Sequence, residues 1–257
     1  MVLLYQRKPA GTKSCVCNLY SMTKDVNAIC QLFGALNDRI GVLPPLPSIF
    51  PDDPAPIVRN ASDHCEIVLA RWGMPSSPFT IMQAVKRRAA KLATKGAQVP
   101  LNQIQRIEPD SGVTNIRNIA SKHWQRWLGP ESRCLVPFTS FSKYDVIKAR
   151  RVPVWFSINK GRPLMAFAGI WTNWTSVRNS DEGEVNADVY GFLTCDPNAE
   201  MRMVHAKTMP VVLTTAEEFD IWMRAPWSEA RHLQSPLNDG SLEIVATGER
   251  EDALCYS

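Results

Sequence analysis

The sequence predicts an α+β protein that folds as a single domain. Helical periodicity dominates the first half of the chain, whereas the second half is rich in short stretches of β-branched and aromatic residues. Helices segregated from a run of strands are typical of α+β folds and not of doubly wound parallel sheets. With 257 residues, of which 45% are hydrophobic, the chain is long enough to bury a sizeable core.

Helical signals occur in four segments. A helix is expected from Thr23, its predicted cap, to the region of Gly34 to Asn37, because apolar residues recur there with a period of 3.6. Residues 80–95 have one apolar face and one basic face, and Gly96 should end that helix. A short helix over 121–128 should pack two tryptophans, and the capping-box pattern of residues 215–218 should open the last helix.

Strands are predicted wherever short runs of β-branched and aromatic residues lie between turn signals. These runs are 64–72, 133–137, 152–158, 164–172, 188–195, 210–214 and 242–246. The prolines of 43–56 predict an extended loop, because proline cannot donate to a central strand. Residues 96–112 should form a polar connector, and residues 1–15 a non-native or disordered leader ahead of a domain covering 16–257.

Composition narrows the functional class. Seven cysteines without a repeating frame predict a reducing, cytoplasmic setting, and no apolar run approaches the roughly 18 residues that a membrane span needs. Glycine-rich nucleotide loops, HExxH and paired CxxC motifs are absent from the sequence, so no cofactor and no metal are expected. The net charge of +4 permits an anionic partner without demanding one.

Five stretches occur in a characteristic order between residues 16 and 250. They are Cys17-Asn-Leu-Tyr, Arg71-Trp72-Gly73-Met74-Pro75, Asn115-Ile116-Arg117, Arg133-Cys134-Leu135-Val136-Pro137, and His205 leading to Met209-Pro210-Val211. Together they resemble the SOS-response-associated peptidase (SRAP) family, in particular a subgroup that begins Cys-Asn-Leu-Tyr. The resemblance implies a strongly bent, mainly antiparallel sheet or open barrel with peripheral helices, and a monomer.

The resemblance also implies a function in the DNA damage and SOS responses. Family members recognise abasic sites in single-stranded DNA and join themselves to the lesion covalently. A free α-amine attacks the aldehyde of the ring-opened sugar to give an imine, and the neighbouring thiol then closes a thiazolidine ring. Because only a 1,2-aminothiol can do both, Cys17 has to become the first residue. The peptidase activity in the family name is expected to remove the residues ahead of Cys17, so the enzyme class stays open between autopeptidase and lyase-like crosslinking.

This sequence departs from the family pattern at its start, since Val16 stands where relatives have the initiator methionine. One hypothesis is that residue 16 is encoded by GTG and is the true start, which reading that codon would test. Cys15 is expected to be an ordinary cysteine, because a metal pair with Cys17 lacks a convincing second pair of ligands.

The other site residues follow from the resemblance. His205 is implied as the acid or base acting on the sugar oxygen, and Asn115 as a holder of the α-amine or the sugar. Arg117 would clamp a phosphate, and Trp72 would stack on a base beside the lesion. The remaining DNA-contact candidates are Asn18, Arg71, Met74 and Arg151.

A second departure concerns Lys143, which occupies the position of the family's catalytic glutamate. A protonated lysine cannot accept the proton of the amine and would repel an ammonium terminus. Three outcomes are open: a desolvated, neutral Lys143 acts as a base or attacks the aldehyde itself, Asp145 substitutes in part, or activity is weakened while DNA binding remains. A noncatalytic reader of damaged or modified DNA and a Cys-His hydrolase are the competing functional classes.

The basic face of the 80–95 helix admits two interpretations. Such a run is usually a solvated surface, and it can also contact phosphates. The basic residues Lys148, Arg150 and Arg151 could extend this face into a rim that follows a nucleic-acid backbone.

Overall fold

A five-stranded barrel forms the centre of the protein. The computed structural model describes residues 19–36, 40–147 and 150–252. Within these ranges, β11 pairs with both β10 and β5, which closes the order β5-β4-β7-β10-β11 into a ring. The barrel strands are β4 (Pro54–Asn60), β5 (Cys65–Trp72), β7 (Arg133–Phe138), β10 (Met165–Asn179) and β11 (Gly183–Cys195). All neighbouring pairs are antiparallel except β5 with β11, so the predicted α+β fold with a mainly antiparallel barrel is confirmed.

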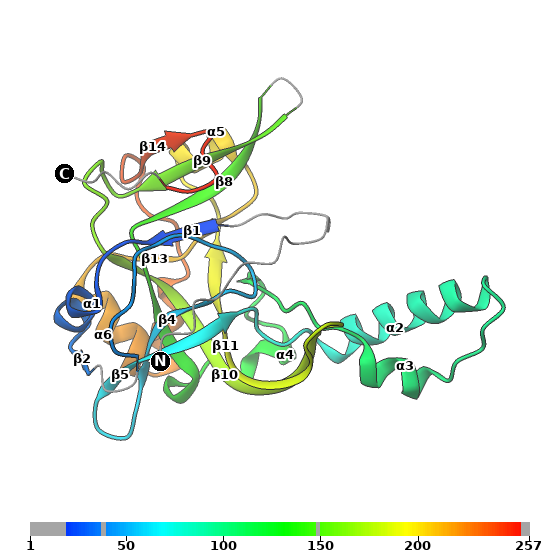
Figure 1. Cartoon of the computed structure of the whole chain (residues 1–257). Helices are drawn as coiled ribbons and strands as arrows, with labels where there is room; N and C mark the ends of the chain where they lie inside the picture. The colour runs from blue at the N-terminus through cyan, green and yellow to red at the C-terminus, as the bar shows by residue number, and fades with distance from the viewer. Residues whose placement is uncertain (1–18, 37–39, 148–149, 253–257) are drawn as a thin grey trace.

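A second, antiparallel sheet lies against the barrel in the order β14-β9-β8-β1-β3 (Figure 1). Its strands are β1 (Leu19–Met22), β3 (Leu46–Ile49), β8 (Ser140–Ile147), β9 (Arg150–Ser157) and β14 (Glu243–Thr247). The short strands are β2 (Ala35–Leu36), β6 (Asn115–Ile116), β12 (Met209–Pro210) and β13 (Val212–Leu213). None of the helices in the described ranges is long and apolar enough to cross a membrane.

Helices cover the periphery of the two sheets. They are α1 (Val26–Phe33), α2 (Pro78–Ala93), α3 (Leu101–Ile107), α4 (Lys122–Gln125), α5 (Ala199–Val204), α6 (Ala216–Arg224) and α7 (Trp227–Ala230), with short 3₁₀ turns at Pro130–Ser132 and Arg231–Leu233. The predicted capping box opens α6, where the Thr215 hydroxyl accepts from the Glu218 N–H at 3.2 Å. The predicted Thr23 cap of α1 is wrong, because Asp25 takes that place and accepts from the Ala28 N–H.

Aromatic packing holds the second sheet on the barrel. The Tyr20 ring of β1 makes edge contacts with Trp72 at 5.1 Å, with Phe167 at 5.8 Å and with Phe192 at 6.1 Å between ring centroids. Its hydroxyl shares a hydrogen bond with the Tyr190 hydroxyl of β11. Because these rings are fully desolvated, β1 is fixed against the barrel by apolar burial together with this polar contact.

Three segments differ from the sequence-based expectation. The proline-rich 43–56 stretch, expected to be a loop, contains β3 and the start of β4. Strand β7 pairs with β4 only at Val58 and Arg59, beyond the prolines of β4. The proline end of β4 therefore needs no second ladder, which is where a strand tolerates proline. The connector 96–112 contains α3, and residues 140–147, for which no strand was predicted, form β8.

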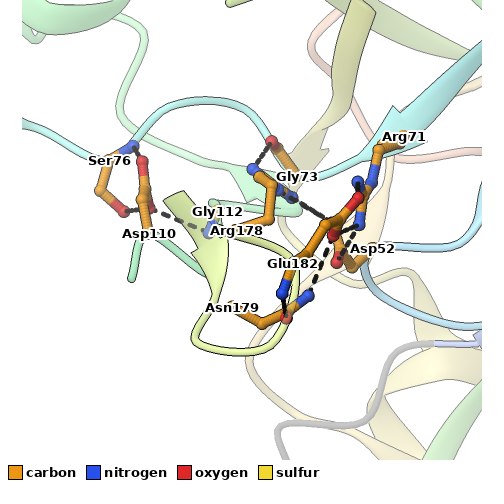
Figure 2. A network of polar contacts seen from close by, with 9 residues as sticks. All are labelled: Asp52, Arg71, Gly73, Ser76, Asp110, Gly112, Arg178, Asn179 and Glu182. Carbon is orange, nitrogen blue, oxygen red and sulfur yellow. Dashed lines mark hydrogen bonds and ion pairs between the residues drawn. The ribbon is translucent and has the colours of Figure 1, made fainter. Parts of the chain in front are cut away.

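The helices α2 and α3 form a hairpin that projects away from the sheets, and it is called here the arm (Figure 1). The two chains that lead to and from the arm are tied together at its base. The Ser76 N–H and hydroxyl donate to the Asp110 carboxylate at 2.9 and 2.7 Å, and the Gly112 N–H donates to the same group (Figure 2). Met74 and Val113 exchange backbone hydrogen bonds just below. These contacts define a neck, residues 73–76 and 110–113.

Two glycines let the chains of the neck touch. Gly112 has φ +78°, and a Cβ there would lie 2.7 Å from the Gly73 Cα. We therefore expect Gly112→Ala to lower the free energy of unfolding by about 2 kcal/mol, through a positive φ and a backbone overlap. Gly96 is a matched control, because it has φ +79° but a Cβ there would meet no other atom within 4 Å. Gly96→Ala should cost about 1 kcal/mol, and equal losses for the two variants in urea unfolding would contradict this view of the neck.

Candidate functional site

Strand β11 brings together three of the segments that the sequence singled out. Arg71 and Trp72 pair in parallel with Val189 and Tyr190 of β11. Further along, β6 pairs in parallel with Phe192 and Leu193, and β12 pairs antiparallel with Thr194 and Cys195. Segments far apart in the sequence therefore meet in succession along one strand.

The end of β11 is flanked on both edges. Leu193 pairs with Ile116 of β6 on one edge and accepts a hydrogen bond from the Val211 N–H at 2.9 Å on the other. The Gln234 side chain donates to the carbonyl oxygens of Arg117 and Thr194, both at 2.9 Å, and so closes this end of the barrel. Asn115 and the segment that follows His205 are thereby held at the same end of one strand.

Asn115 lies on β6 with its amide oxygen buried. Among the described residues, that Oδ1 has no hydrogen-bond partner. The next residue, Ile116, is fully buried and Arg117 is exposed, which fits the alternation expected for an extended segment. A buried acceptor without a partner is costly in a folded protein, so the Asn115 oxygen is available to accept a hydrogen bond from a ligand.

Lys143 is a buried residue of β8, which lies between β1 and β9 in the second sheet. On β8 it follows Ser142, which pairs with Leu19 at the start of β1, and it shares a face with Phe141. Phe141 packs on Phe138, Phe156 and Phe167, so this face is the apolar one. Only 3% of Lys143 is exposed, and burial lowers the pKa of its ammonium to about 8.

His205 lies at the C-terminal end of α5, the helix that packs against the strand of Lys143. Its backbone N–H closes the helix on Met201 at 2.7 Å, and α5 packs against β8. The pKa of His205 is lowered, first by burial and then by the positive charges of Lys143 and Lys207. The structure thus brings His205 and Lys143 together, and both pKa shifts favour the neutral form of each group.

Arg117 and Arg151 occupy exposed positions. Arg117 makes an ion pair with Asp196 at 2.5 Å, and the Asp196 side chain is itself 76% exposed. Exposed pairs of this kind contribute little to stability, so a phosphate can replace the carboxylate at small cost. Arg151 is exposed at the start of β9.

The predicted DNA contacts of Trp72 and Met74 are not supported by their positions. Trp72 is 0% exposed, its ring stacks on Phe192 at 5.2 Å, and its Nε1 donates to the Thr114 carbonyl at 3.2 Å. Met74 is equally buried. The sequence shows that Trp72 belongs to a candidate motif, but the rings of Tyr20 and Phe192 that cover it come from strands distant in the chain. Trp72 therefore acts as a support beneath β6 through its hydrogen bond to the residue before Asn115.

Arg71 is also placed differently from the prediction. Its guanidinium is divided between Asp52, at 2.7 and 3.2 Å, and Glu182, at 2.6 and 3.0 Å (Figure 2). Arg178 binds the same Asp52 and donates to the Gly73 carbonyl at 3.1 Å. The position of Arg71 does not support the predicted DNA contact, because Arg71 belongs to an ion-pair network with Asp52, Glu182 and Arg178 at the neck of the arm.

Two of the predicted residues, Cys17 and Asn18, lie outside the described residues. Sequence reasoning missed the Tyr20–Tyr190 pair and the Asp52–Arg178 contact that positions Gly73. Tyr20 belongs to the Cys-Asn-Leu-Tyr stretch, which was the available signal for the first. In the described ranges, no cluster of three or more His, Cys, Asp or Glu side chains could hold a metal ion.

The fold and site define a class: a small barrel protein with the candidate amide of Asn115 beside the end of β11, and with the amine of Lys143 and the imidazole of His205 on the packed elements β8 and α5. The chain belongs to the SOS response associated peptidase (SRAP) family, whose model matches residues 16–249. No curated protein matches the chain.

Three of the solved structures with a similar fold come from two bacteria. A protein from Bacteroides thetaiotaomicron is 18% identical with a TM-score of 0.61, over 88% of this chain and 89% of its own. A protein from Bordetella bronchiseptica is 22% identical with a TM-score of 0.59, over 90% and 98%. A phage-related protein from the same organism is 14% identical with a TM-score of 0.59, over 88% and 92%. At these identities the likeness concerns the fold.

Proposed function

We propose that this protein binds abasic sites in single-stranded DNA and forms a thiazolidine crosslink through Cys17 once that residue is N-terminal. Family membership implies abasic-site crosslinking. The observation that carries the proposal for this chain is the position of Lys143 beside the start of β1, close enough to His205 for its charge to lower the pKa of the imidazole. Cys17 precedes Leu19 by two residues, so covalent geometry keeps their Cα atoms within about 7 to 8 Å of each other.

The reaction balances without a cofactor. The α-amine of Cys17 adds to the aldehyde carbon, and loss of one water gives the imine. The thiolate then adds to the imine carbon, a C–S bond forms, and the ring nitrogen takes up a proton. An α-amine has an ordinary pKa of about 7.7–8.0 and a thiol of about 8.5, so both need a base near neutral pH.

Lys143 and His205 supply the proton transfers in this proposal. Because burial lowers the pKa of Lys143 to about 8, roughly a tenth of it is neutral at about pH 7 and can take the proton of the α-ammonium. His205 has a lowered pKa and is neutral at that pH, so it can accept a proton from the sugar hydroxyl on ring opening. It then returns that proton to the leaving hydroxyl of the carbinolamine.

The exposed cations Arg117 and Arg151 contact the phosphates in this proposal. Autoproteolysis ahead of Cys17, as the family name suggests, is one route to the free terminus.

Asn115 positions the α-amine through its unpartnered Oδ1. We expect Asn115→Ala to slow crosslinking about tenfold, because the amine loses its acceptor. The free energy of unfolding should change by less than about 0.5 kcal/mol, since no described residue bonds that oxygen. Gel crosslinking rates and urea unfolding check the two halves. A large decrease in the free energy of unfolding with an unchanged crosslinking rate would show that Asn115 has a structural role and does not position the amine.

A crosslinking assay on denaturing gels tests the proposed function. A chain whose first residue is Cys17 should give a DNA adduct that survives denaturation without a reductant. Cys17→Ser and a chain that retains residues 1–16 should give none, or at most an imine that appears only after borohydride reduction. An adduct of equal yield in all three proteins would rule out the aminothiol.

The second candidate function is a noncatalytic reader of damaged or modified single-stranded DNA. Lys143 at the position of the family's glutamate favours this alternative, because it weakens the proton relay. The same gels separate the two functions: tight binding of abasic DNA under native conditions, with no adduct after denaturation, would support the reader.

A further inference from the structure

The arm carries the net positive charge of the whole chain. Residues 78–108 include six Lys or Arg and one acidic residue, a net charge of +5, whereas the complete chain has +4. The remainder of the protein is therefore at −1. Because the arm projects from the sheets, this charge is presented away from the candidate site (Figure 1).

A groove of about 600 Å³ runs between the two helices of the arm. Its floor is apolar and is made by Leu92, Val99, Ile104 and Ile107. Its basic residues are Arg87, Arg88, Lys91 and Lys95. Arg88 pairs with Glu108 at 2.6 Å, whereas Arg87, Lys91 and Lys95 are exposed to solvent.

The floor of the groove is open to solvent in part. Ile107 is 60% exposed, and Leu92 and Val99 are half-buried. An apolar strip with cations beside it fits a ligand that carries apolar groups and negative charges together. A nucleic-acid backbone would satisfy the cations but would leave the apolar floor uncovered, because phosphate contacts need only the charges.

The neck fastens both ends of the arm to the barrel through hydrogen bonds and ion pairs. Asp110 ties the entering and leaving chains, Arg178 binds the Gly73 carbonyl, and Arg71 and Arg178 share Asp52 (Figure 2). An arm whose two ends are already fastened loses less conformational entropy when a partner binds. A second copy of this chain is a poor occupant, because the protein outside the arm has a net charge of only −1.

We propose that the groove of the arm is a docking site for an acidic segment of a partner protein, with apolar side chains between its carboxylates. The apolar side chains lie on the accessible part of the floor, formed by Leu92, Val99 and Ile107, and the carboxylates pair with Arg87, Lys91 and Lys95. This proposal does not depend on the abasic-site chemistry. Docking recruits the protein to a partner while the end of β11 and β8 remain free.

Fluorescence anisotropy with the full chain tests the site. The probe is a fluorescein-labelled synthetic peptide of Asp and Glu interrupted by Leu and Phe, and its control replaces Leu and Phe by Ser. The double variant Arg87→Glu/Lys91→Glu should weaken binding of the probe at least about tenfold. The matched double variant Lys86→Glu/Arg106→Glu makes the same charge change on the arm outside the groove, and should weaken it no more than about twofold.

The apolar floor has its own matched pair. Ile107→Ser removes a side chain of the groove, whereas Phe79→Ser removes one that is 73% exposed on the arm but does not line it. Ile107→Ser should weaken binding of the probe peptide about fivefold or more, and Phe79→Ser should leave its affinity unchanged. Because both side chains are largely exposed, thermal unfolding should show both variants folded.

Three outcomes would overturn the proposal. Equal weakening by the two charge variants would reduce the effect to general electrostatics. Equal affinity for the serine control peptide would remove the role of the floor. Binding of single-stranded or duplex oligonucleotides that depends on Arg87 and Lys91, with no binding of the peptide, would make the arm a nucleic-acid contact.

Discussion

Crosslinking at about pH 6.5 should become roughly tenfold faster when Lys143 is replaced by Glu in a chain that begins at Cys17. With a pKa of about 8, only a few per cent of Lys143 is neutral at that pH. A carboxyl starts from an ordinary pKa of about 4.3, so a larger fraction is ionised and can accept a proton even though burial raises its pKa. The positive charge that repels the α-ammonium is removed as well. Single-turnover rates from denaturing gels with abasic single-stranded DNA measure the effect.

The pH profile distinguishes the role of Lys143 from a general charge effect. Wild-type rates should rise steeply through about pH 8, while the Lys143→Glu variant should be flatter, because only Cys17 then titrates in that range. Lys207→Glu is the matched control, since Lys207 is exposed and also lowers the pKa of His205. If Lys143→Glu crosslinks no faster than wild type in the lower pH range, the assignment of Lys143 as the limiting base is wrong.

Replacing Lys143 by Met should stabilise the protein by about 3 kcal/mol at about pH 7. Burial lowers the pKa of Lys143 from 10.5 to about 8, so the unfolded chain binds this proton more tightly than the folded protein does. Each unit of difference corresponds to about 1.4 kcal/mol, and the full cost of the buried ammonium is present below the folded pKa. Met keeps the volume of the side chain and removes the charge.

The sign of the pH dependence follows from the same linkage. The stability of the wild type should rise between about pH 8 and 10.5, as the folded protein loses a proton that the unfolded chain still holds. The gap between Lys143→Met and wild type should therefore shrink across that range. Urea unfolding at several pH values measures it, and a Met variant less stable than wild type at about pH 7 would show that the ammonium is stabilised by its surroundings.

The elements that the sequence predicts correctly are those whose signal is local in the chain. The capping box at Thr215 and Glu218 is a contact between neighbours in the chain, and α6 begins there. Gly34 ends α1 in the left-handed conformation for the same reason. The prolines of β4 led to the wrong prediction of a loop. Whether a strand tolerates proline depends on where its neighbour pairs with it, here where β7 pairs with β4, and that is a property of the sheet and not of the segment.

The candidate site divides in the same way. The resemblance selected Asn115, Lys143 and His205, and the structure brings His205 beside Lys143. The positions of Trp72 and Arg71 could not be predicted, because Phe192 covers the first and Asp52 and Glu182 bind the second from distant parts of the chain. A motif residue that the sequence suggests is exposed and binds a ligand can therefore instead be buried or paired, and hold neighbouring segments in place.

Mass spectrometry of the crosslinked peptide tests the central claim most directly. Protein beginning at Cys17 is reacted with abasic single-stranded DNA, digested with a protease and a nuclease, and fragmented. We expect one adduct on the N-terminal peptide, located at Cys17, with the mass of the two components less one water and unchanged by borohydride. An adduct on Lys143 that gains two hydrogens on reduction, or no adduct on the Cys17 peptide, would contradict it.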